Sequence, residues 1–577
     1  MPSYNDYLHE SSKLLYEYSP NFQISIDLIQ KLAQHLKLDT FVDSEVQDPD
    51  TNQLVKRLSI AGSLLLVDID FKDPHTVTKV SLASGNHSTS AVNTASSQSE
   101  LNSVISTTKI DNTTIVRVNF LEENVLSFLN IRNADEKSVA EIILKENLKG
   151  SKLGNFPLNL RYLANLDRLS PQEGDLVLYL DNIAKYLEVI HIQECKLTPE
   201  DENIKSGQSS LIGKLMYNDE EANELGVFLH FWKSYNKTNK LPQVDYFKPQ
   251  SFVGRLSVIE SNAPAKDYLR ESTKALWEPK DANGNFLEYK ITFDDEKHLP
   301  KGVPVSGPNT RNWQLQFSFN RPVYLPKEVL EFLGFDDFEV AEDHELKDIF
   351  EAIEQFKVVD LTLDSHPNVA FQLNHSSFSS FIPVSAVTLP SLNSISKLLP
   401  PLRNSIVYST WLTSLVLQTQ CQISDAYSTE AKKQRDTRPE LTEDELLGIN
   451  SMAENNTYVG VQILDSNTNT DLEDFLKQED EDENMDKDNG ESKAVTPVEQ
   501  GPFMELCFDD VDFTTKELEF QFVVDGKTQS GKPIQKNFSL QNGQTVGTGL
   551  ADDLPSVNFV KALSLGEDLL LALDVVN

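Results

Sequence analysis

Asp68 and Asp70 are the residues whose types and spacing come nearest to a chemical site. They alternate with apolar residues in the stretch Val67–Phe71, and residues two apart in a strand lie on one face. Two carboxylates on one face can share a divalent cation through hard oxygen ligands, as at some glycosyl- or nucleotidyl-transfer sites. The sequence offers no third carboxylate or phosphate loop nearby. The competing interpretation is therefore that both aspartates line the solvated face of a half-buried strand.

The other motifs that carry catalysis are missing from the sequence. Ten histidines are scattered, none in an HExxH pattern and none spaced with cysteine for zinc. His366 and His375 bracket a predicted strand, where each is a metal ligand or a hydrogen-bonded loop histidine. No glycine-rich phosphate loop and no GxSxG motif occurs. A spatially assembled triad stays open, but we expect no cofactor, no metal and no enzymatic activity.

The charge balance limits the partners. The 577 residues carry 51 Lys+Arg against 89 Asp+Glu, a net charge of −38, which disfavours gripping nucleic acid or an anionic membrane. Residues 440–512 hold 22 acids and 3 bases, a net of −19 and half of the total. We therefore expect no direct DNA contact, although a basic patch on the folded part stays open. The imbalance mainly reports one acidic segment.

Cysteine usage and hydropathy bear on the compartment. Cys195, Cys421 and Cys507 form no CxxC pair, and an odd count suits no disulfide framework. This indicates a reducing compartment, the cytosol or the nucleus. We find no signal peptide, and the longest apolar run, around Leu64–Val67, is far too short to span a membrane.

The elements that must position these residues indicate an α+β fold. Helical spacing over residues 4–38, with Ser25 as an N-cap, precedes a predicted strand Leu58–Phe71 that forms a hairpin with Thr76–Ala83. Inserted helices are predicted at Lys327–Leu333 and Glu345–Phe356 within the β-rich region. Pro400-Pro401 is predicted to break an apolar helix over 389–420. The whole chain divides into an N-terminal helical and hairpin module (1–84), a disordered Ser/Thr/Asn-rich loop (85–110), a helical region (111–200), a β-rich region ending in helices (210–420), a disordered acidic insert (424–500) and a C-terminal strand and helix block (501–577). The order is fold, insert, fold, which the slow growth of loop-closure entropy allows.

Two apolar sets are candidates for protein contacts. The first recurs at helical spacing and forms either a docking face or an internal core seam: Leu176, Leu180, Ile183 and Leu187. The second lies just before the densest acids and belongs either to an activation segment or to a solvating spacer: Leu472, Phe475 and Leu476. The basic group Lys432–Arg435 is a nuclear-import signal or a solvated stretch.

Several segments together resemble subunit 1 of the Mediator complex in its fungal form. The first runs from Leu28 to Phe41, then through Leu58–Phe71 and Val77–Ser84. Weaker matches are Leu158–Leu169 with the following helix, and Ile382–Arg403 with its Ile-Pro and Leu-Pro steps. The family's animal members carry LxxLL boxes; the nearest segment here is Ile395–Leu399, so receptor binding by that route is not transferred and the segment is expected to be a core helix.

The resemblance implies a nuclear, non-enzymatic subunit of the middle module of Mediator. Its partners would be other Mediator subunits, transcription activators and, indirectly, RNA polymerase II. Asp68 and Asp70 would then be framework residues of a hairpin. Two alternatives stay open: a cytosolic acidic chaperone or adaptor, and an enzyme with a metal site at Asp68 and Asp70.

Overall fold

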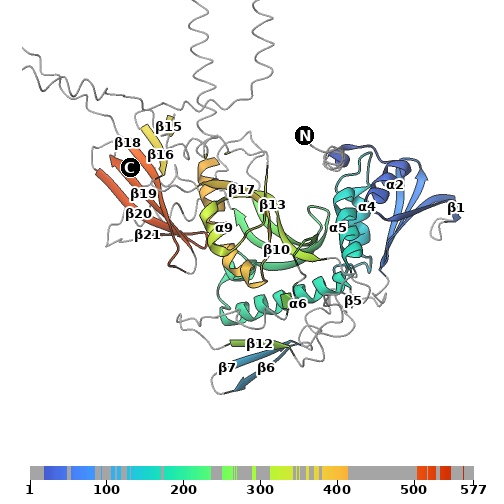
Figure 1. Cartoon of the computed structure of the whole chain (residues 1–577), viewed down its shortest axis with the longest axis horizontal. Coiled ribbons are helices and arrows are strands. Elements are labelled where there is room, and N and C mark those ends of the chain that lie inside the picture. Colours follow the sequence, from blue (N-terminus) through green and yellow to red (C-terminus); the bar gives the residue numbers. More distant parts are fainter. Residues whose placement is uncertain are drawn as a thin grey trace, which may run out of the picture.

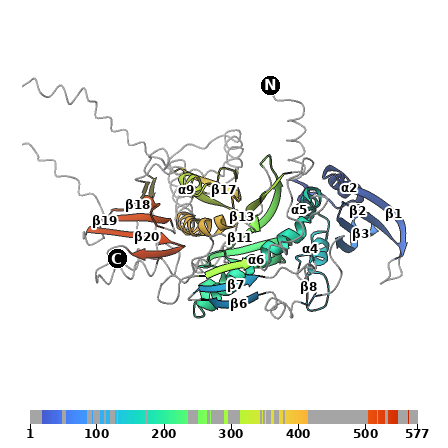
Figure 2. The same cartoon turned by 60° about the horizontal axis from the view of Figure 1, so that its bottom comes forward.

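The computed structural model describes the greater part of the chain outside the acidic insert. The described residues are 18–47, 54–84, 92–93, 105–110, 113–118, 127–129, 131–170, 175–234, 250–263, 266, 268–269, 289–293, 312–341, 346, 350, 359–362, 370–375, 380–413, 503–515, 518–527, 533–547 and 563. They mix helices and strands, which confirms the α+β class. Three larger sheets lie in a row, the N-terminal sheet at one end, a central sheet, and a C-terminal sheet at the other end (Figures 1 and 2).

The N-terminal sheet is antiparallel and has four strands in sequential order. They are β1 (Asp39–Gln47), β2 (Leu54–Ala61), β3 (Leu65–Asp73) and β4 (Thr76–Ser84). The predicted hairpin of the last two strands is confirmed. The prediction of one strand over Leu58–Phe71 is wrong, because the chain turns at residues 62–64 and splits it into β2 and β3. The turn is fixed by a distant aspartate, Asp167, which binds its amides, so local periodicity could not reveal it.

Helices cover the inner face of this sheet and continue beneath the central one. They are the 3-10 turn η1 (Ser19–Asn21) and the helices α2 (Ile26–His35), α4 (Val139–Asn147), α5 (Phe156–Leu169), α6 (Leu176–Leu197) and α7 (Glu202–Ser206). Ser25 caps α2 as predicted, because its side-chain oxygen accepts from the Leu28 amide at 3.2 Å. The part of the 4–38 prediction before residue 18 lies outside the described residues.

Short strands occupy the stretch predicted as a disordered loop and the start of the helical region. They are β5 (Val92–Asn93), β6 (Ile105–Ile110), β7 (Thr113–Val118) and β8 (Ile131–Arg132). Helix begins only at Val139, so the boundary predicted at 110/111 is wrong. Alternating β-branched residues in 105–118 favour strand, and β7 pairs with the distant β12 (Tyr289–Phe293), a long-range contact that the polar composition concealed.

The central sheet has six strands in the order β14-β17-β13-β11-β10-β9. Their bounds, with the helix α9, are β9 (Lys214–Asp219), β10 (Glu224–Ser234), β11 (Gln250–Glu260), β13 (Trp313–Pro326), α9 (Lys327–Leu333), β14 (Phe338–Val340) and β17 (Phe381–Thr388). The β-rich prediction for this region is confirmed, as is a helix predicted at Lys327–Leu333. A second helix predicted at Glu345–Phe356 lies mostly outside the described residues.

The C-terminal sheet joins strands from both sides of the acidic insert. Its strands are β15 (Val359–Thr362), β16 (Ala370–His375), β18 (Phe503–Asp512), β19 (Glu519–Lys527), β20 (Pro533–Gln541) and β21 (Gln544–Gly547). β18 follows the insert and pairs in parallel with β16, which precedes it. The chain therefore leaves this sheet after β16 and returns to it at β18. The block after residue 500 completes a sheet begun earlier and is not a separate unit.

A long helix over residues 393–413 links the central and C-terminal sheets. The prediction that Pro400-Pro401 breaks it is wrong, since helix continues on both sides of the prolines. Proline in a helix interior removes a backbone hydrogen bond, but here Leu398, Leu399 and Leu402 are all fully buried, and this packing outweighs the local penalty. Ile395–Leu399 is therefore core, as expected. One contiguous hydrophobic core runs from Ile24 to Leu563.

Candidate functional site

The aspartate pair is engaged by the neighbouring strand. The Asp70 carboxylate receives two hydrogen bonds from Arg57, at 2.7 and 2.9 Å. Asp68 accepts from the Ser59 hydroxyl at 2.6 Å. These are directly opposed cross-strand pairs of β2 and β3. Asp70 is only 2% exposed, so it is not the solvated residue that the sequence suggested, whereas Asp68 is partly exposed. With their oxygens held by Arg57 and Ser59, the aspartates act as framework residues.

The leucine seam of α6 lies inside the protein. Leu176, Leu180 and Ile183 are fully buried, and Leu187 is 1% exposed. Leu187 lines an apolar cavity of about 10 Å³ between α6 and Leu392, room for a single water at most. The docking-face interpretation is corrected accordingly, because these side chains pack the chain's own core and offer no surface to a partner.

The remaining sequence candidates are placed more briefly. Several candidates lie outside the described residues: Leu472, Phe475, Leu476, His366 and the Lys432–Arg435 group. His375 is the last residue of strand β16. Among the residues that the structure describes, no His, Cys, Asp and Glu side chains gather into a set of three that could hold a metal ion. No helix in the described ranges is long and apolar enough to cross a membrane.

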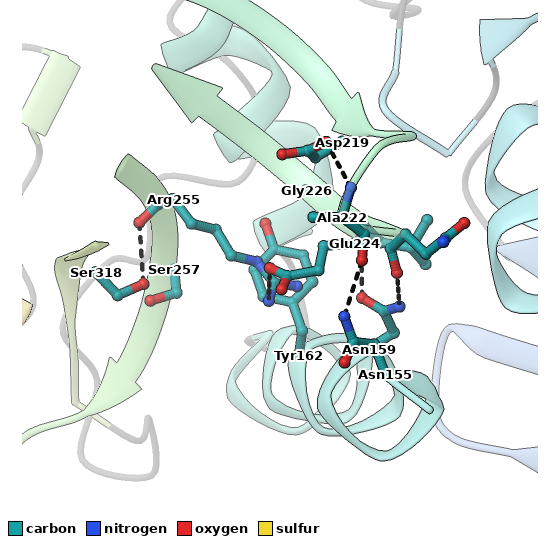
Figure 3. Close-up of polar contacts among 12 residues, drawn as sticks. Asn155, Asn159, Tyr162, Asp219, Ala222, Glu224, Gly226, Arg255, Ser257 and Ser318 are labelled. Carbon is teal, nitrogen blue, oxygen red and sulfur yellow. Dashed lines mark hydrogen bonds and ion pairs between the residues drawn. The ribbon is translucent and has the colours of Figure 1, made fainter. Parts of the chain in front are cut away.

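What the fold does bring together is a set of buried polar joints between its sheets. The first joins α4 and α5 to the turn between β9 and β10 (Figure 3). The backbone carbonyl of Asn223 accepts from the Asn147 amide at 3.1 Å and from the Asn159 amide at 2.9 Å. Asn155 binds the Ala222 carbonyl at 2.8 Å, and Asn159 also accepts from the Leu225 amide at 2.8 Å. Three asparagines therefore clamp one turn.

A cation–π contact stands beside this clamp. The guanidinium of Arg255 on β11 lies 3.9 Å from the ring centroid of Tyr162 on α5, a favourable arrangement when desolvated. Glu224 lies 3.7 Å from the same guanidinium. Burial lowers the pKa of Arg255, raises that of Glu224 and raises the pKa of Tyr162 to about 12. The Tyr162 hydroxyl donates to the Leu256 carbonyl at 3.2 Å.

Gly226 makes this contact possible. Its φ is 138°, a conformation that other residues rarely adopt. A Cβ at this position would stand 3.0 Å from the Tyr162 hydroxyl and 3.1 Å from the Arg255 Nε. The glycine thus allows the tyrosine and arginine to approach the backbone of β10.

The same two helices hold the N-terminal sheet on their other side. The Asp167 carboxylate of α5 accepts from the amides of Ser63, Leu64 and Leu65 at 2.9, 2.6 and 3.1 Å. Glu141 of α4 accepts from the Leu82 amide on the outer edge of β4 at 2.9 Å. Helices α4 and α5 therefore form a bracket that fixes one sheet to the next.

Arg403 forms the joint between the central sheet and the C-terminal sheet. It is fully buried in the helix 393–413. Its guanidinium donates to the carbonyls of Phe231 at 3.0 Å, Gly207 at 3.0 Å and Ser210 at 2.6 Å, and to the side chain of Asn542. The neighbouring Asn404 binds the Leu518 carbonyl at 3.2 Å and accepts from the Gly543 amide at 2.7 Å.

Sequence reasoning missed these joint residues. Arg403 fell within the resembling segment, but nothing local assigned it a role. The available signals were weak: single asparagines in apolar helices, an arginine after Leu402, and Gly226 in a strand. Each signals a buried polar contact or a close approach only when its partner is known.

Comparison with known proteins identifies the family. A comparison with curated proteins finds no match. The model of the family described as Mediator of RNA polymerase II transcription subunit 1 matches residues 9–416. This range is more than half of the chain, and it contains the N-terminal sheet, the α4–α5 bracket and Arg403. The chain therefore belongs to the family of Mediator subunit 1, a subunit of a non-enzymatic scaffold for transcription coactivation.

Proposed function

We propose that this chain is a fungal-type subunit 1 that works in the nucleus, within the middle module of Mediator. It has no enzymatic activity in this proposal and makes no direct DNA contact. It contacts other Mediator subunits, receives transcription activators and relays their signal to RNA polymerase II indirectly. The family match supports membership of the complex, while the module, the activators and the nuclear location of this chain are inferred from the resemblance.

The observation that carries the proposal is the chain of joints. The α4–α5 bracket fixes the N-terminal sheet to the central sheet, and Arg403 with Asn404 fixes the central sheet to the C-terminal one. Buried and mutually satisfied polar contacts rigidify the unit that they connect. A rigid frame holds its surfaces at fixed spacing, which is what a scaffold requires.

Purification of the tagged full-length chain from nuclei of its own cells, followed by crosslinking mass spectrometry, tests the proposal. We expect co-purification of other Mediator subunits, with crosslinks concentrated on middle-module subunits. Recovery of the chain without any Mediator subunit would refute the proposal. Exclusion of a fluorescent fusion from the nucleus would favour the acidic chaperone or adaptor instead.

The acidic insert supports a second candidate role. Leu472, Phe475 and Leu476 stand next to the densest acids, a composition typical of interaction segments. We propose that this segment contacts other transcription proteins. Replacing the three apolar residues by serine should weaken reporter activation while the purified complex keeps its composition. Unchanged activation would assign the insert to a spacer.

A further inference from the structure

The two edges of the N-terminal sheet differ in how they are covered. An edge strand presents backbone donors and acceptors that can pair with another chain. At β4 this edge is covered by α4, whose Glu141 carboxylate accepts from the Leu82 amide at 2.9 Å. Strand β1 lies on the rim of the molecule in both views (Figures 1 and 2). Among the described helices, α2 packs against it, under the inner face of the sheet.

The outer edge of β1, which pairs with no other strand among the described residues, carries an exposed aromatic residue between two acids. Asp39, Phe41 and Asp43 share the outer face of the strand, because they lie two apart. Both aspartates are exposed, and Phe41 is 59% exposed. A bulge follows between Asp43 and Val46, so the regular pairing edge is limited to Asp39–Asp43.

The charges of this edge select against some partners. In an antiparallel pair of two copies centred on Phe41, Asp39 of one copy would face Asp43 of the other. Like charges directly opposite one another are destabilising. Arg57 lies directly opposite Asp43 on the neighbouring strand and offsets its charge only in part, because its guanidinium already donates twice to Asp70. A strand with lysine or arginine opposite each aspartate and an apolar residue opposite Phe41 is complementary.

We propose that β1 is a docking edge for an extended, basic segment of another Mediator subunit, which adds to the sheet as a fifth strand. The expected pattern is basic, any, apolar, any, basic, in register with Asp39, Phe41 and Asp43. Main-chain hydrogen bonds to the edge would give affinity, and the alternating side chains would give specificity. The identity of the partner as a Mediator subunit rests on the proposed function; the acidic pairing edge does not.

Hydrogen exchange of the full-length chain, alone and in the purified Mediator complex, tests the proposal. We expect the amides of residues 39–43 to exchange at least about tenfold more slowly in the complex, and crosslinks from this strand to reach a basic segment. The double variant Asp39→Lys/Asp43→Lys should lose that protection. Two exposed ion pairs turned into repulsions correspond to about a tenfold loss of affinity.

Matched controls separate docking from general charge and folding effects. Asp135→Lys/Glu136→Lys makes the same charge change on an exposed turn outside the asparagine clamp and should keep the protection. Phe41→Ser should reduce it, whereas Phe332→Ser on α9, with a side chain 58% exposed, should not. Unchanged exchange of β2 and β3 amides in the free variants shows that the sheet is intact.

The outcomes distinguish this inference from the proposed function. If the chain is recovered without other Mediator subunits, the proposed function fails. If it is in the complex but residues 39–43 exchange as in the free chain, only the docking edge is overturned. Protection by an acidic segment or by a second copy of this chain also overturns it.

Discussion

Replacing Arg403 by methionine should destabilise the junction of the central and C-terminal sheets. The guanidinium is fully buried and reaches three backbone carbonyls and Asn542. Methionine preserves much of the apolar stem but leaves the carbonyls of Gly207, Ser210 and Phe231 without this donor. Each hydrogen bond to a charged group contributes about 1.5–3 kcal/mol, and a buried acceptor left unpaired adds its desolvation cost. Since such effects are not additive, we expect a total loss of about 4 kcal/mol.

Thermal unfolding followed by tryptophan emission measures this loss. Trp232 and Trp411 are buried near the junction; Trp411 lies in its helix, and a Cβ on Gly543 would meet the Trp232 ring. At about 2–4 °C per kcal/mol for a unit of 150–250 residues, the Arg403→Met midpoint should fall by roughly 10 °C. Arg403→Lys should fall by less, since it keeps the charge but not the planar set of donors.

The exposed Arg321 provides the matched control. Arg321→Met makes the same chemical change on the surface, where substitutions usually alter stability by less than about 0.5 kcal/mol. A midpoint for Arg403→Met within about 2 °C of that for Arg321→Met would refute the reasoning. It would mean that water or a rearranged backbone satisfies the three carbonyls without the arginine.

Three further predictions concern the bracket and its surroundings. Gly226→Ala should lower the free energy of unfolding by about 3 kcal/mol, because the added Cβ would crowd Tyr162 and the backbone is strained. Gly150→Ala is also at positive φ but has nothing within 4 Å of the added Cβ, so it should lower the free energy of unfolding by about 1 kcal/mol. Equal melting temperatures of the two variants would contradict this prediction. Asp167→Asn should lower the melting temperature by the equivalent of about 2 kcal/mol, since one amide oxygen cannot replace a carboxylate that accepts three backbone amides; an unchanged melt would show that the turn holds itself. Burial raises the pKa of Asp181 to about 7, so between about pH 4 and 7 the folded state holds a proton that the unfolded state has lost. The free energy of unfolding therefore falls as pH rises through that window. Denaturant midpoints at pH 5 and pH 8 should show the stability of Asp181→Asn rising relative to the wild type at pH 8, and the opposite trend would be evidence against this assignment.

Local patterns sufficed where the structure is decided by neighbours in sequence. Ser25 as a cap, the hairpin of β3 and β4, and the helix at Lys327–Leu333 follow from capping chemistry and periodicity. The resemblance also identified the family, because it rests on residue order. The return of the chain after the insert was predicted from its composition, since dense like charges resist compaction.

Tertiary contacts decided the rest, because their partners are far apart in sequence. The turn at residues 62–64 depends on Asp167, about a hundred positions away, and the strand β7 on a partner near residue 290. The helix through Pro400-Pro401 persists because its leucines are buried between two sheets. The same reason turned the α6 seam from a candidate surface into core.

The sequence by itself determined the class of elements, the family and the acidic character of the chain. It did not determine which polar residues would be buried, because burial depends on which surfaces meet. Asp70, Asn159 and Arg403 look ordinary in the sequence, and each became a fixed contact only when another element supplied its partner. The buried polar joints that connect the three sheets are therefore a property of the tertiary structure.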